Sequence, residues 1–152
     1  MCASTAQREF DNVVAPQRLN PASAPAPAGK YRQLTITASG TPVATFAGQI
    51  ATTATGTAPA GAAEQTRLVF AAIGDLLASQ GAGPADLIKL TTFVVGRENL
   101  AGFSAVRDEI YADWFPGGDF PSNTLILVAG LATESLLVEI EGSFACPPST
   151  LS

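Results

Sequence analysis

The sequence predicts an α+β domain in which two helices lie on one face of a single mixed β-sheet. Three features indicate this class: strand-like alternation towards both ends, two stretches of helical periodicity, and an apolar, β-branched run between those stretches. The length of 152 residues fits one domain of ordinary size. Hydrophobic residues make up 47% and charged residues 14%, a combination that excludes an intrinsically disordered chain.

The beginning of the chain is expected to lead into the domain as an extended segment. Residues 1–19 are interpreted as an N-terminal extension that need not be ordered, residues 20–147 as the folded domain and residues 148–152 as a tail. Prolines at positions 16, 21, 25 and 27 exclude a helix there and favour a strap across the surface. Alternation over 34–38, a turn cluster containing Gly and Pro, and a second strand over 43–48 then predict a β-hairpin.

The middle of the chain changes between helical and strand patterns. Apolar residues recur at helical spacing over 62–80, and Gly81 and Pro84 mark the end of that helix. The run 86–95 is apolar and β-branched, which predicts a strand buried on both faces. A second helix is expected over 103–115. Its apolar face consists of Phe103, Val106, Ile110 and Trp114.

Two further strands are expected near the C-terminus, over 124–128 and 136–144. In the last strand Val138 and Ile140 share one face. The opposite face is formed by Leu137, Glu139 and Glu141. Because both helices cover one face of the sheet while the other face still carries apolar side chains, we expect another copy of the chain to cover that second face.

Composition excludes several classes of function. The chain has no histidine, which excludes a Ser-His-Asp triad, a Cys-His dyad, a His-ligated metal and a His-pair ribonuclease mechanism. The net charge is -5, so a nucleic-acid partner is disfavoured. Seven acids and no base follow Arg107, a pattern that indicates either a solvated acidic face or acids that line a site. No glycine-rich phosphate-binding motif is present, and no cofactor or metal is expected.

The cysteines and the apolar segments bear on the cellular compartment. Cys2 and Cys146 lie near the two ends of the chain and are expected to be unpaired thiols rather than a disulfide. No stretch approaches the ~20 apolar residues of a membrane span. The first residues lack the basic region and apolar stretch of a secretory signal, so we expect a cytoplasmic protein without a membrane partner.

Glu139 is the strongest candidate for a chemical role. Strand interiors seldom hold glutamate, yet Glu139 and Glu141 stand two apart on one face of a strand that is otherwise apolar. Such a carboxylate must be paired, be solvated in a cavity or have a raised pKa, because an unpaired buried charge is costly. A raised pKa suits a general acid or base at neutral pH. The alternative is that both glutamates face water, or a cavity between subunits, without a chemical role.

Three other residues give weaker signals. Tyr31 stands just before the first strand, where a tyrosine is usually a packing residue with a hydrated hydroxyl. Gly48 ends the second strand and indicates a close approach to the backbone. Asp108 belongs with Glu109 and Asp113 to the second helix, and all three are interpreted as solvated surface.

Five segments of the chain resemble motifs of one known family, in the same order and at the family's spacing. They are NPASAPAPAGKYRQ, FAGQI, EQTRLVFAAIGDLLASQGAGPADLIKLTTFVV, FPSNTLILVAGL and LLVEIEG. Over about residues 20–147 the chain therefore resembles the RidA/YjgF family of small trimeric enamine/imine deaminases. The resemblance implies a chorismate-mutase-like fold, a homotrimer, and substrate pockets in the clefts between neighbouring subunits.

The resemblance also implies roles for individual residues. Tyr31 aligns with a pocket tyrosine, and Glu139 with the glutamate that positions or activates the hydrolytic water. Asp108 falls where the family often has an asparagine, next to an apparent one-residue insertion. Asn123 replaces the arginine with which the deaminases bind a substrate carboxylate, and Leu125 replaces a common cysteine. The implied pocket is therefore more apolar and less cationic than a 2-iminoacid site.

Two functions follow as hypotheses. The first is an enzyme that hydrolyses or tautomerises a largely neutral or aromatic enamine, imine or related unsaturated molecule, with Glu139 as acid/base, Tyr31 as a polar wall and Asn123 as the substrate anchor. The remaining substrate-binding positions are Gly48, Asp108 and Leu125. Efficient 2-iminoacid hydrolysis is not expected, because losing a charge-assisted partner costs roughly 2–5 kcal/mol of binding. The alternative is a non-catalytic ligand-binding or regulatory trimer. Ribonuclease activity is disfavoured by the missing histidine and the acidic charge.

Overall fold

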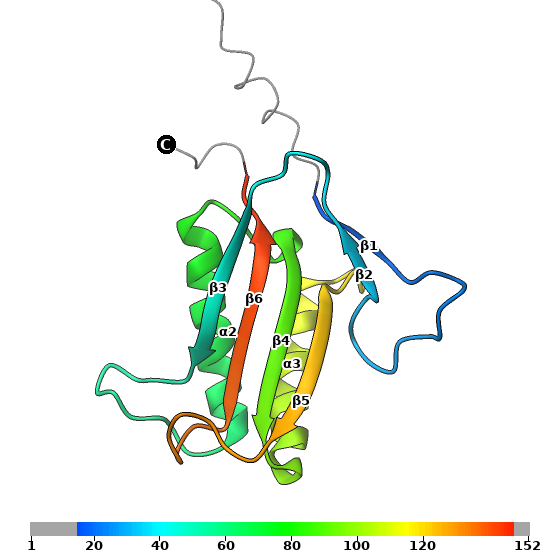
Figure 1. Ribbon diagram of the computed structural model, residues 1–152. Helices are drawn as coiled ribbons and strands as arrows, with labels where there is room; N and C mark the ends of the chain where they lie inside the picture. Colours follow the sequence, from blue (N-terminus) through cyan, green and yellow to red (C-terminus); the bar gives the residue numbers. More distant parts are fainter. Residues whose placement is uncertain (1–14, 148–152) are drawn as a thin grey trace, which may run out of the picture.

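A four-stranded mixed sheet with two helices on one face forms the body of the protein in the computed structural model, which describes residues 15–147 (Figure 1). The strand order is β3-β6-β4-β5, in which β6 pairs antiparallel with β3 and β4, and β4 pairs parallel with β5. Its elements are β3 (Val43–Ile50), α2 (Ala62–Ser79), β4 (Leu87–Val95), α3 (Leu100–Trp114), β5 (Ser122–Val128) and β6 (Val138–Ala145). The α+β class predicted from the sequence is confirmed.

The core lies between the sheet and the helices. The helix α2 presents Val69, Ile73 and Leu77, all fully buried, to the sheet. Across the interface, β4 and β6 bury Leu90, Val94, Val138 and Ile140. The predicted alternation of β6 is confirmed, since its burial changes from one residue to the next over the first part of the strand. The face of the sheet opposite the helices is open in Figure 1.

The second helix is rotated relative to the expected apolar face. Phe103 and Val106 are buried as predicted, but Ile110 and Trp114 are only partly buried and Tyr111 is 2% exposed. Tyr111 is drawn inward by an aromatic cluster, with Phe70 edge-on at 5.9 Å and Phe120 stacked at 5.4 Å between ring centroids. Aromatic packing therefore decides the orientation of α3 more than the spacing of its aliphatic residues does.

The strand β4 is buried on one face only. Leu90, Thr92 and Val94 are buried against the helices, whereas Lys89 and Phe93 on the other face are half-buried. The expectation of a strand buried on both faces is therefore wrong for a single protomer. The reason is that α2 and α3 cover the same side of the sheet, so the open side has no cover within one chain.

The predicted hairpin of residues 34–38 with 43–48 is wrong. The strand β2 (Leu34–Ile36) pairs antiparallel with β1 (Gln17–Leu19) in a separate two-stranded sheet, while β3 pairs with β6. Residues 17–19 thus form a strand within a segment that the sequence suggested need not be ordered. Because the sequence predicted no strand over 17–19, the nearest predicted strand that could pair with 34–36 was 43–48.

Arg18 explains why β1 is held against the domain. Its side chain is buried, and its guanidinium donates hydrogen bonds to the carbonyl oxygens of Asp119 (2.7 Å), Leu87 (2.7 Å) and Ala85 (2.9 Å). Burial lowers the pKa of Arg18, and the nearby Asp119 carboxylate opposes that shift. A buried cation needs such partners, so moving β1 away would break these hydrogen bonds and cost free energy.

Other features of the described chain bear on membranes and cysteines. None of the helices among residues 15–147 is both long and apolar enough to cross a membrane. Cys146 is a buried free thiol at the end of β6, and its backbone N–H donates to the carbonyl of Pro42. Cys2 and the expected C-terminal tail lie outside the described residues.

Candidate functional site

Glu139 lies at the start of β6 on the open face of the sheet. Its cross-strand neighbours in the ladder are Ile50 on β3 and Phe93 on β4, and Phe93 is in turn paired with Ile126 on β5. Paired residues point to the same face, so the carboxylate stands in a row of apolar side chains. Glu139 is half-buried, and among the described residues it has neither an ion-pair partner nor a side-chain hydrogen bond.

Gly48 lies directly beneath the Glu139 side chain. A Cβ atom at position 48 would collide with Glu139 Oε1 and would stand 2.7 Å from its Cδ. The pairing of β3 with β6 shifts register between Phe46 and Gln49, which is where Gly48 lies. The glycine therefore provides the close approach that the sequence indicated, and the shift in register places it next to the carboxylate.

Gln65 fixes the chain just before Glu139, and the sequence analysis did not identify it. Its side chain is fully buried on α2, where Oε1 accepts from the Leu137 N–H at 2.7 Å and Nε2 donates to the Ser135 carbonyl at 2.8 Å. Nε2 also donates to the Pro59 carbonyl at 2.9 Å. The helical spacing could have identified it, because Gln65 stands four residues before Val69 and therefore lies on the same, buried face of α2.

Asn123 and Leu125 lie on the opposite side of the sheet from Glu139. Asn123 is paired with Leu90 and Leu125 with Thr92, both of which face the helices. The Thr92 hydroxyl donates to Asn123 Oδ1 at 3.0 Å, which places the asparagine side chain on the helix side at the outer strand of the sheet. Within one protomer, Asn123 and Glu139 therefore cannot contact the same small molecule.

Asp108 lies on α3, on the helix side of the sheet, and Tyr31 lies in the segment before β2. Lys30 Nζ is 3.2 Å from Asp108 Oδ2, and Arg107 donates two hydrogen bonds to Asp108 Oδ1. Arg32 on the other side of Tyr31 donates to the Gly118 carbonyl. Lys30 and Arg32 therefore hold the segment around Tyr31 against α3 and against the residues that follow α3. The Tyr31 hydroxyl accepts a hydrogen bond from the Ala28 N–H at 3.2 Å.

The electrostatics of Asp108 differ from those of a solvated surface acid. Partial desolvation acts to raise its pKa, but the hydrogen bonds and charges of Arg107 and Lys30 outweigh that effect, so the pKa lies below the ordinary value. Asp108 is therefore a partly exposed surface acid that is paired with Lys30 and Arg107. Glu109, next to it, is exposed and pairs with Arg67 at 2.8 Å.

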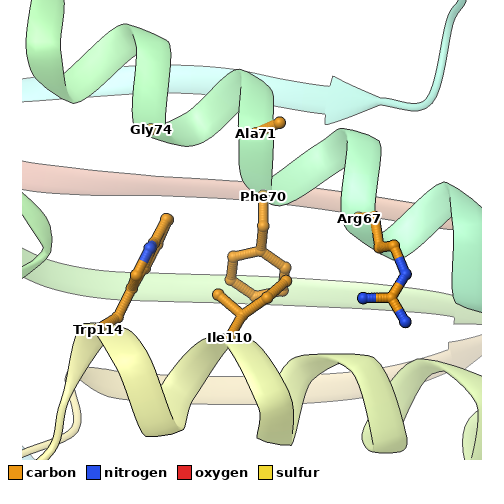
Figure 2. Close-up of a pocket in the computed structure, with 6 residues that line it drawn as sticks. All are labelled: Arg67, Phe70, Ala71, Gly74, Ile110 and Trp114. Atoms are coloured by element: carbon orange, nitrogen blue, oxygen red, sulfur yellow. The ribbon is translucent and has the colours of Figure 1, made fainter.

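Two hollows lie close to these elements. One, of about 400 Å³, is an apolar groove between α2 and α3, in which Phe70, Ile110 and Trp114 face one another (Figure 2). Its remaining lining residues are Arg67, Ala71 and Gly74. The other, of about 230 Å³, lies on the open face of the sheet further along β6 from Glu139. Among residues 15–147, no group of three or more His, Cys, Asp or Glu side chains is placed to hold a metal.

The four-stranded mixed sheet with two helices on one face is the YjgF/RidA fold, which solved structures of that family share with this chain. Residues 21–145 match the sequence model of the family described as Endoribonuclease L-PSP. The chain belongs to this family, the RidA/YjgF family, as its sequence motifs predicted.

Solved structures support the same assignment. YyfB from Yersinia pestis, a protein of unknown function in the Rid family, is 33% identical, with a TM-score of 0.71 over 88% of this chain and 99% of that one. The YjgF gene product of E. coli is 25% identical, with a TM-score of 0.61 over 85% and 98%. Rv2704 from Mycobacterium tuberculosis is also 25% identical, with a TM-score of 0.56 over 69% and 80%. The comparison with curated proteins gave no match.

Proposed function

We propose that the protein is a homotrimeric enzyme that hydrolyses or tautomerises a largely neutral enamine or imine in clefts between its subunits, with Glu139 as the general acid/base. The observation that carries this proposal is the position of Glu139, an unpaired carboxylate packed over Gly48 in an apolar row. Enzymes place acid/base groups in such partly desolvated surroundings.

The division of the candidate site supports a cleft between subunits. Glu139 and Gly48 lie on the open face of the sheet, whereas Asn123, Leu125 and Asp108 lie on the helix side. Ile126 on the open face is 40% exposed, and apolar surface of this kind favours burial against another copy. A neighbouring subunit whose outer strand β5 meets this open face would bring the two sets together.

The chemistry requires only one proton carrier and a water molecule. In hydrolysis, the Glu139 carboxylate takes a proton from water as the water oxygen bonds to the imine carbon, and the nitrogen is protonated. The resulting carbinolamine then loses ammonia or an amine as the carbonyl forms, with protons passing back through Glu139. Tautomerisation uses the same carboxylate to move one proton from carbon to nitrogen.

Specificity would depend on the residues from the helix side. Asn123 offers an amide that hydrogen-bonds neutral groups and carries no positive charge for a carboxylate. Leu125 adds an apolar contact, and Tyr31 with Asp108 closes the end of the cleft. The family description names an endoribonuclease, but the absence of histidine and the net charge of -5 do not suit RNA cleavage by this chain.

The test compares Glu139→Gln with Glu134→Gln, an exposed glutamate in the segment just before β6. Imines would be generated in solution by an amine oxidase, and their breakdown followed by ammonia release. We expect Glu139→Gln to lower turnover roughly 10²–10⁴-fold, the usual range for a general acid/base. Glu134→Gln should retain turnover.

Light scattering of both variants and of the parent protein supplies the second readout. We expect a trimer in every case. Full turnover by a trimeric Glu139→Gln protein would contradict the enzymatic proposal and favour the ligand-binding alternative. A monomer that is fully active would contradict the shared cleft.

A further inference from the structure

Gln65 is a fully buried polar side chain that connects α2 with the two loops beside the proposed catalytic group. Its Nε2 donates to the Pro59 carbonyl at 2.9 Å and to the Ser135 carbonyl at 2.8 Å, and its Oε1 accepts from the Leu137 N–H at 2.7 Å. A side-chain amide has two N–H donors, and both are used here. All three partners are backbone groups, so the amide determines where the main chain of both loops runs.

The two loops adjoin the two strands on which Glu139 and its neighbour Gly48 lie. Residues 51–61 follow β3 and residues 129–137 precede β6, and both segments lie at the lower end of the sheet in Figure 1. The last residue of β3, Ile50, is the cross-strand partner of Glu139. Gln65 therefore joins the loop that follows this partner to the loop that precedes Glu139.

The main chain at Leu137 is held by Gln65 and β4 rather than by β3. The ladder between β3 and β6 ends with the pair of Ile50 and Glu139, so it does not extend to Leu137. The Leu137 N–H donates to the Gln65 side chain instead, and the Leu137 carbonyl accepts from the Val95 N–H at 2.9 Å. Because both polar groups of this residue have partners, the main chain has a defined position two residues before Glu139.

We propose that Gln65 is a positioning residue, which sets the place of the Glu139 carboxylate through the backbone of residues 135–137. This inference rests on the proposed function, in which that carboxylate is the acid/base. The Glu139 side chain lies over Gly48 in the space that a Cβ atom would fill, so a small displacement of its backbone changes that fit. A misplacement of about 1 Å can cost roughly 10²-fold in rate.

The test replaces the amide while keeping a buried side chain of similar length. Gln65→Met removes all three hydrogen bonds, and Gln65→Glu keeps an acceptor for Leu137 but loses at least one donor. Thr66→Val is the matched control, because Thr66 is equally buried on the same helix and its hydroxyl donates to the Ala62 carbonyl within α2. Urea unfolding of each variant identifies a temperature at which all of them are folded, and every measurement is made there.

Turnover of the imine that an amine oxidase forms from benzylamine gives the first readout. We expect Gln65→Met to lower kcat and kcat/KM by the same factor, roughly 10–100-fold, because the acid/base acts in the transition state rather than in substrate binding. Gln65→Glu should lose less turnover, and Thr66→Val should retain that of the parent. A loss of stability alone does not produce this difference, since both buried side chains lose hydrogen bonds.

The second readout does not depend on activity. It is the ¹³C resonance of the Glu139 carboxylate in protein labelled at glutamate, assigned by its absence from Glu139→Gln. We expect this resonance to move in Gln65→Met and to stay in place in Thr66→Val. If the parent protein does not turn over the imine, the proposed function fails, and the resonance alone decides whether Gln65 positions the carboxylate.

Four results would overturn the positioning role. They are a folded Gln65→Met protein in which the Glu139 resonance is unchanged, a resonance that moves while an active parent's turnover is retained, a rise in KM with kcat unchanged, and an equal loss of turnover in Thr66→Val. If Gln65→Met does not fold, Gln65→Glu decides by the same criteria.

Discussion

The side chain of Glu139 occupies the space in which a Cβ atom on residue 48 would lie, so only glycine fits at that position. This contact links a shift in the register of β3 to the orientation of the proposed catalytic group on β6. A glycine is required here by the neighbouring side chain, and no positive φ is involved.

Gly48→Ala is expected to abolish most of the activity while leaving the fold stable. The new methyl group must displace the end of a flexible side chain at the sheet surface, which costs little stability but moves the carboxylate. Turnover should fall by about the same factor as in Glu139→Gln, and thermal unfolding should change little. Gly130→Ala is the matched control, since a Cβ there meets no atom within 4 Å. Retained turnover in Gly48→Ala would show that the position of Glu139 does not matter.

Asn123→Arg is expected to give the protein activity towards carboxylated imines. A guanidinium at the outer strand can bind a carboxylate with two hydrogen bonds, which Asn123 cannot do. The same change removes the acceptor of the buried Thr92 hydroxyl, so we expect a stability loss of about 1–3 kcal/mol. Hydrolysis of a 2-iminoacid relative to its neutral analogue measures the gain. If the folded variant shows no gain, other parts of the pocket have diverged as well.

Asp108 should make the Tyr31 segment sensitive to acid. Because the pKa of Asp108 lies below its ordinary value in the folded protein, its contribution to stability is complete above pH ~4 and is lost as the pH falls through the lowered pKa. The group is partly exposed, so the contribution stays below about 1 kcal/mol. Unfolding midpoints between pH 6 and 3 should drop less for Asp108→Asn than for the parent. Asp113→Asn, an exposed acid on the same helix, should behave like the parent.

Burial of Tyr111 should make the free energy of unfolding decrease at alkaline pH, whereas Asp108 makes it decrease in acid. Burial raises the pKa of Tyr111 to about 12, with the nearby Arg107 and Arg18 opposing that shift. The neutral phenol is therefore favoured by folding, and its contribution is complete below pH ~10 and is lost as the pH rises towards the folded value. In a Tyr31→Phe protein, tyrosinate absorbance then reports Tyr111 alone, and we expect its midpoint near 12. A midpoint near 10 in the folded protein would contradict the burial.

Arg18→Met should detach β1 and β2 from the domain. The substitution leaves the carbonyl oxygens of Leu87, Ala85 and Asp119 without their donor, and buried acceptors of this kind cost about 1–3 kcal/mol each when they remain unsatisfied. Denaturant unfolding should show a loss of at least ~2 kcal/mol. Arg18→Lys should rescue only part of it, because a single ammonium cannot reach all three carbonyls. Arg97→Met, at an exposed site, is the control.

The sequence predicted the two helices, the four strands of the main sheet, the alternation of β6 and the family. These features depend on local periodicity and on ordered motifs, which are properties of neighbouring residues. Glu139 and Gly48 also stood out as individual residues, because a glutamate and a glycine are unusual in strands. The pairing of β2 with β1 was missed, since it depends on the burial of Arg18 against carbonyl groups more than sixty residues away.

Only the tertiary structure decided which candidate residues share a surface. Sequence spacing cannot show that Asn123 and Glu139 point to opposite faces, because that relation depends on the register of β5 and β6 against β4. It also could not show that Asp108 is held by Lys30, that Gln65 fixes the start of β6, or that Lys89 and Glu141 border one hollow. Each of these is a contact between distant segments, and such contacts are set by how strands pair and helices pack rather than by the residues on their own.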